Sequence, residues 1–124
     1  MSVIKQLYGI YHANGGIIGE LSYIIGKYRG TTHCALCDIT HGTISMKNKW
    51  KELSRGLNVP FNLVHLNERI DDIISISENN TPCIIAETED SFHMLISSEE
   101  LEKCNKSVDN FGIILNEKIR LRHN

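Results

Sequence analysis

The sequence predicts an α/β fold: one domain over residues 1–124, in which helices flank a central mixed sheet of about four strands. Short runs of β-branched and aromatic residues alternate along the chain with segments whose apolar residues recur at helical spacing. A Thr-Pro dipeptide and a polar run mark a β-hairpin in the second half of the chain. With 41% hydrophobic and 23% charged residues, the 124-residue chain has the size and composition of one globular domain.

A glycine-containing break separates the first predicted strand from the first predicted helix. Residues 3–11 are mostly apolar and aromatic and predict a strand, which residues 12–16 interrupt. Apolar residues then recur at helical spacing from Ile17 to Tyr28, so we expect a helix with one apolar stripe. Gly30 is placed to end this helix.

A long connection leads from this helix to the second strand. Its first part, residues 31–42, fits a helix, a loop or a strand equally well. Ser45 is placed to cap a second helix that has Trp50 on its apolar face and Gly56 near its end. Residues 61–66 are apolar and aromatic and predict the second strand.

The hairpin is predicted from its turn residues. Residues 67–77 suit a short helix, and Thr81-Pro82 then leads into a strand over residues 83–86. The polar residues 87–91 predict a turn, after which residues 92–96 return antiparallel to the third strand.

The last part of the chain begins with a clear cap and ends ambiguously. Ser97 and Glu100 have the spacing of a capping box, which predicts a helix that runs through Cys104. Beyond Asn105 the pattern fits either strands or a terminal helix.

This order of elements resembles that of the thioredoxin-like fold. The resemblance is carried by the strand before His12, the strand over residues 61–66, the Thr81-Pro82 turn into a hairpin, and the helix after Ser97. It implies a thioredoxin-like sheet with an enlarged connection between the first helix and the second strand. It also implies a cis peptide bond before Pro82, with that proline lying against the active site.

The cysteines depart from the pattern of that family. Thioredoxin-like enzymes place a Cys-x-x-Cys at the start of the first helix, where the helix dipole and backbone N–H groups lower the thiol pKa. Here residues 12–16 occupy that place and contain no cysteine. The Cys-x-x-Cys of this chain, Cys34 to Cys37, follows the first helix instead, so the family's usual chemistry is not implied.

Residues 33–41 concentrate the side chains that can do chemistry. In a helix, Cys34, Cys37 and His41 lie on one face, and in a loop they form a short chelating bite. In a strand, the two cysteines point to opposite faces and cannot act together. Thiolate and imidazole donors suit zinc or iron, so the leading hypothesis is a small protein that binds such a metal through these three residues. Further candidate ligands are His33, His12, Asp38, Cys83 and Cys104.

Two other functions stay open at this point. One is a thiol–disulfide oxidoreductase that cycles Cys34 and Cys37, with His33 or His41 stabilising a thiolate. The other is a non-catalytic binding module on a thioredoxin-like scaffold, whose cysteines are simply buried as small hydrophobic residues. The sequence does not decide whether the protein is an enzyme.

Charge and hydropathy indicate the cellular compartment of the protein and exclude some classes of partner. The net charge of −2 provides no basic field for nucleic acid or anionic lipid. No apolar stretch approaches the roughly 20 residues that span a bilayer, and residues 1–10 lack the apolar core of a signal peptide. We therefore expect a cytoplasmic protein with neither a nucleic-acid nor a membrane partner. A homodimer stays open, and the sequence names no other partner.

Overall fold

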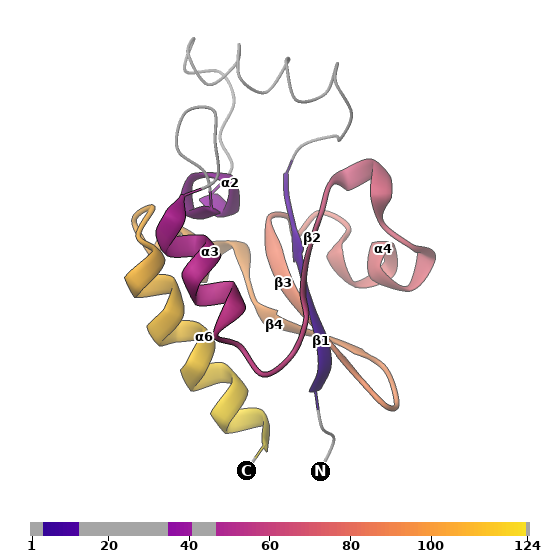
Figure 1. The fold of residues 1–124 in the computed structure, drawn as a ribbon. Helices are drawn as coiled ribbons and strands as arrows, with labels where there is room; N and C mark the ends of the chain where they lie inside the picture. The colour runs from indigo at the N-terminus through magenta and orange to yellow at the C-terminus, as the bar shows by residue number, and fades with distance from the viewer. Residues whose placement is uncertain (1–3, 13–34, 41–46, 124) are drawn as a thin grey trace, which may run out of the picture.

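A computed structural model describes residues 4–12, 35–40 and 47–123 of the chain (Figure 1). The predicted first helix, from Ile17 to Tyr28, lies outside these residues, as does Ser45. The described part is an α/β arrangement of helices around a mixed sheet, which confirms the fold class at that level.

The sheet has four strands in the order β2-β1-β3-β4. They are β1 (Ile4–Ile10), β2 (Phe61–Val64), β3 (Cys83–Thr88) and β4 (Phe92–Ile96). β1 pairs parallel to β2 and antiparallel to β3, and β3 and β4 form the predicted antiparallel hairpin.

One edge of this sheet collects the ends of three strands. Ile10, the last residue of β1, pairs with Val64 at the end of β2 and with Cys83 at the start of β3. The Tyr11 N–H continues the ladder by donating to the Val64 carbonyl oxygen at 2.9 Å. We call this side of the sheet, where strands end, the β1 carboxyl edge, and it is marked by Ile10, Val64 and Cys83.

Helices cover the two faces of the sheet unequally. Figure 1 shows α3 and α6 side by side on one face and α4 on the other. The helices are α2 (Ala35–Thr40), α3 (Asn48–Arg55), α4 (Asp71–Ser77), α5 (Ser98–Glu102) and α6 (Val108–His123). Because strand side chains alternate between faces, Leu7 and Tyr11 of the first face join a large core, whereas Tyr8 and Ile10 join a smaller core under α4.

Aromatic residues hold the large core together. Trp50 of α3 lies edge-on to Phe61 of β2, with ring centroids 5.0 Å apart, and its centroid is 5.6 Å from that of Phe111 of α6. α3 begins after Lys47 rather than after Ser45, and Gly56 caps its end, as predicted.

β2 is shorter than predicted and ends at Val64 rather than at Leu66. His65 instead precedes a short 3-10 helix, η1 (Leu66–Glu68). Its backbone N–H donates to Glu68 Oε1 at 2.8 Å, so the backbone turns away from the sheet at this point. The predicted helix over residues 67–77 is therefore divided between η1 and α4.

The hairpin and the chain end also differ in detail from the prediction. β3 extends to Thr88, so the turn is shorter than residues 87–91. The predicted capping box at Ser97 is confirmed, but α5 ends at Glu102, two residues before the predicted end at Cys104. The φ angles of Asn105 and Lys106, 51° and 64°, prevent any α-helix from continuing past this point. The ambiguous residues beyond Asn105 form α6, not strands.

Candidate functional site

The candidate site lies where α2 packs on the β1 carboxyl edge. Residues 35–40 are helical, so this part of the ambiguous segment is neither a strand nor a loop. Leu36 and Ile39 are fully buried in the large core and attach α2 to the sheet. Gly9 permits this close approach, because a Cβ there would lie 3.2 Å from Leu36 Cδ2 and 2.9 Å from Phe61 Cε1.

A buried hydrogen bond fixes the other end of α2. The hydroxyls of Tyr11 and Thr40 lie 2.8 Å apart, and these residues are only 4% and 0% exposed. The bond lies away from water, where breaking a hydrogen bond between polar groups is costly. Tyr11 therefore connects the β1 carboxyl edge to the last residue of α2.

Cys37 lies between these two attachments and is joined in a disulfide. The residue is 7% exposed. Cys83 and Cys104 are both free and buried. A disulfide sulfur is not a thiolate, so Cys37 is not a metal donor in this oxidised state.

The Thr81-Pro82 turn meets the same edge. Its peptide bond is cis, as the resemblance to the thioredoxin-like fold implies. His12 Nδ1 lies 2.7 Å from Thr81 Oγ1, so the residue after Tyr11 contacts the turn directly. Tyr11 and His12, which follow β1 directly, thus contact α2 and the proline turn respectively.

His65 is a residue at this edge to which the sequence assigned no role. Its ring centroid lies 5.1 Å from that of Tyr11, and its Nδ1 lies 2.8 Å from Glu68 Oε1. The backbone and side-chain hydrogen bonds from His65 lower the pKa of Glu68. The spacing His-x-x-Glu, typical of a capping arrangement, is the sequence signal for this pair.

Four of the candidate metal ligands have described side chains: Cys37, His12, Cys83 and Cys104. Cys37 is in α2, and His12 follows β1. Cys34, His33 and His41 lie outside the described residues, as does the side chain of Asp38. In the part of the chain that is described, no three His, Cys, Asp or Glu side chains converge as a metal would require.

The two free cysteines lie in different cores, and the sheet separates Cys83 from Cys37. Cys83 belongs to the smaller core under α4, on the opposite face of the sheet from Cys37. Burial raises the pKa of Cys83 to about 12, although Arg69 opposes the shift. Burial and the nearby Glu100 carboxylate raise the pKa of Cys104. Both thiols therefore stay protonated near neutral pH, and Cys104 is part of the large core.

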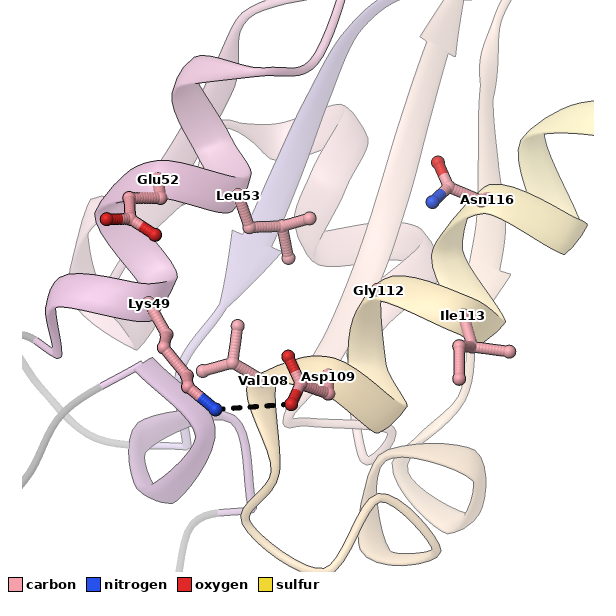
Figure 2. Close-up of a pocket in the computed structure, with 8 residues that line it drawn as sticks. All are labelled: Lys49, Glu52, Leu53, Val108, Asp109, Gly112, Ile113 and Asn116. Carbon is pink, nitrogen blue, oxygen red and sulfur yellow. Dashed lines mark hydrogen bonds and ion pairs between the residues drawn. The ribbon is translucent and has the colours of Figure 1, made fainter.

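A groove of about 580 Å³ lies between α3 and α6 (Figure 2). Leu53, Gly112 and Ile113 contribute to its apolar part. Lys49 Nζ and Asp109 Oδ2 form an ion pair across it, 3.2 Å apart, so these opposite charges neutralise each other. Its described lining contains neither histidine nor cysteine, which separates the groove from the chemistry at the β1 carboxyl edge.

Comparison with protein-family models finds no match, and the same holds for curated proteins and for solved structures. Among the described helices, none combines the length and the apolar character that crossing a membrane requires.

Proposed function

We propose that this protein is a thiol–disulfide oxidoreductase in which Cys34 and Cys37 exchange between disulfide and dithiol. The disulfide on Cys37 is the observation that carries the proposal. Cys83 and Cys104 are free thiols, and the sequence has four cysteines, so Cys34 is the one that remains as a partner. The short Cys-x-x-Cys spacing is typical of exchanging pairs.

The scaffold that we propose is thioredoxin-like. The strand order β2-β1-β3-β4 supports it, with β1 and β2 parallel and β3 antiparallel to β1. The position of Pro82 directly before β3 supports it as well. On this scaffold α2, which carries Cys37, is attached to the same sheet edge as the proline turn.

The proposed reaction transfers two electrons between a dithiol and the protein disulfide. A substrate thiolate attacks one sulfur of the Cys34–Cys37 bond, which breaks and leaves the other sulfur as a thiolate that takes up a proton. The second substrate thiol, as a thiolate, attacks the mixed disulfide and leaves as a substrate disulfide, and the released cysteine takes up the second proton. Because Cys37 is almost fully buried, the first attack is directed to the sulfur of its partner.

Metal binding is the second proposal, and it applies to the reduced protein. The Cys-x2-Cys-x3-His spacing supports zinc or iron bound by Cys34, Cys37 and His41, with His33 and His12 in reserve. The two proposals compete for one residue, since Cys37 provides either a disulfide sulfur or a thiolate ligand.

A thiol count after oxidation and reduction tests the first proposal. We expect the fully reduced, denatured chain to show four thiols and the oxidised chain two fewer, reversibly. Cys37→Ser abolishes this change, whereas Cys104→Ala, the matched loss of a buried free cysteine, keeps it. A wild-type chain whose thiol count does not change between dithiothreitol and an oxidised-glutathione buffer refutes the proposal.

Elemental analysis of the same samples separates the second proposal from the first. If the reduced wild type holds close to one equivalent of zinc or iron and Cys37→Ser holds none, metal binding is supported. If the metal content stays below about a tenth of an equivalent and is the same in both proteins, the metal proposal is refuted.

A further inference from the structure

Tyr11 has contacts that suit it to hold the disulfide-bearing helix in place. Its hydroxyl lies 2.8 Å from Thr40 Oγ1 in a fully buried setting. Its ring packs beside His65, whose own ring is held by Glu68 at 2.8 Å. Tyr11 is thus fixed at both its ring and its hydroxyl, which gives α2 a rigid attachment point.

Cys37 occupies the stretch of α2 between two such attachments. Leu36, directly before it, packs against the backbone at Gly9, and Thr40 closes the helix on Tyr11. Disulfides tolerate only a narrow range of Cα separations and side-chain directions. A helix that is held at both ends limits how far Cys37 can move when the disulfide opens.

We propose that Tyr11 is a positioning residue for the exchange, and that its bond to Thr40 keeps Cys37 arranged for closing the disulfide. This inference rests on the proposed function. A preorganised pair of thiols has a high effective concentration, so the disulfide resists reduction. Without the bond, the reduced form gains conformational freedom, and the disulfide becomes easier to reduce.

The chain contains a matched control on the same strand. The Tyr8 hydroxyl donates to Glu87 Oε1 at 3.0 Å, and Tyr8 packs with the smaller core on the opposite face of the sheet. Tyr8→Phe therefore removes the same chemical group as Tyr11→Phe without touching α2. A purely structural effect of losing a tyrosine hydroxyl appears in both variants, whereas a positioning effect appears in one.

The experiment equilibrates the full chain in glutathione buffers and measures the oxidised fraction of the pair. Relative to wild type, we expect Tyr11→Phe to favour the dithiol roughly three- to tenfold, the range set by the net worth of one hydrogen bond. A tenfold change corresponds to a rise in reduction potential of about 30 mV. Tyr8→Phe is expected to keep the wild-type equilibrium.

Thr40 provides the second arm if Tyr11→Phe does not fold. Thr40→Val removes the hydroxyl and is expected to reproduce the shift, and Thr40→Ser keeps the hydroxyl and is expected to restore the wild-type value. Equal equilibria in wild type and Tyr11→Phe, or in the two Thr40 variants, overturn the positioning role while the exchange function stands. A wild type without a reversible pair refutes the proposed function itself, and the positioning role with it.

Discussion

Replacing Gly9 by alanine tests whether the close packing of α2 on the sheet is as tight as the structure indicates. The added Cβ would lie 2.9 Å from Phe61 Cε1, 3.0 Å from Leu63 Cδ2 and 3.2 Å from Leu36 Cδ2. These atoms come from β2 and α2, so the new methyl group pushes on two elements at once. Because Gly9 lies in an extended strand, the expected cost is steric and not conformational.

The magnitude follows from two opposing contributions. Overpacking a filled core by one methyl group costs about 1 to 3 kcal/mol. Alanine gains about 0.5 to 1 kcal/mol over glycine within a strand, because it loses less backbone freedom on folding. The net expectation for Gly9→Ala is a loss of about 1 to 2 kcal/mol in the free energy of unfolding.

Urea unfolding followed by tryptophan fluorescence measures this loss, since Trp50 is the only tryptophan and lies in the large core. With a typical m value, the midpoint falls by about 0.5 to 1 M urea. Gly112→Ala in α6 is the matched control, because a Cβ there lies 3.4 Å from its nearest neighbour, Leu53 Cδ1. That variant is expected to gain up to about 1 kcal/mol from helix propensity. A Gly9→Ala variant at least as stable as wild type would refute the tight packing of α2.

Three further outcomes follow from the described contacts. Phe111→Ala is expected to lower the free energy of unfolding, measured by urea denaturation, by about 3 to 5 kcal/mol, because it empties the space beside Trp50. A loss below about 1 kcal/mol would contradict this packing. Cys83 is expected to resist maleimide at pH 8 in the folded protein and to react in denaturant, because burial raises its thiol pKa to about 12; rapid labelling of folded protein, located by mass spectrometry, would argue against its burial. The hydrogen bonds from His65 lower the pKa of Glu68, so the contribution of this carboxylate to stability is present above its ordinary pKa of 4.5 and is lost as the pH falls through the lowered value. Glu68→Gln should therefore flatten the acid limb of a plot of unfolding free energy against pH. Identical plots for the variant and wild type would exclude that contribution.

Cys37 is distant in the sequence from the end of β1 but is attached to it in the structure. In the sequence, the Cys-x-x-Cys lies far from the place where thioredoxin-like enzymes carry theirs. In the structure, Tyr11 joins α2 to the end of β1, and His12 joins the same strand end to Thr81. Cys37, which follows the predicted first helix in the sequence, is thus attached through α2 to the sheet edge that the proline turn also meets.

Local signals were sufficient for the elements whose structure depends on neighbouring residues. The hairpin of β3 and β4 follows from alternation and turn residues, and the cap of α5 follows from Ser97 and Glu100, three positions apart. The cis bond before Pro82 was implied by the resemblance and is present. Strand ends were less predictable, because the end of β2 depends on a contact between His65 and Glu68 that competes with the sheet.

Contacts between distant residues decided the rest. The apolar pattern beyond Asn105 fits both the period of a strand and that of a helix. The segment forms the helix α6, in which Phe111 packs against Trp50. Residues 31–42 had no preferred structure by pattern, and the helix over residues 35–40 is fixed by burial on Gly9 and by the Tyr11–Thr40 bond. Spacing and pattern were enough to place the hairpin and the cap of α5, and to single out Cys34 and Cys37 as a candidate pair. The position of Cys37 could not be predicted from local pattern, because the Tyr11–Thr40 bond that attaches its helix joins residues 29 positions apart in the chain.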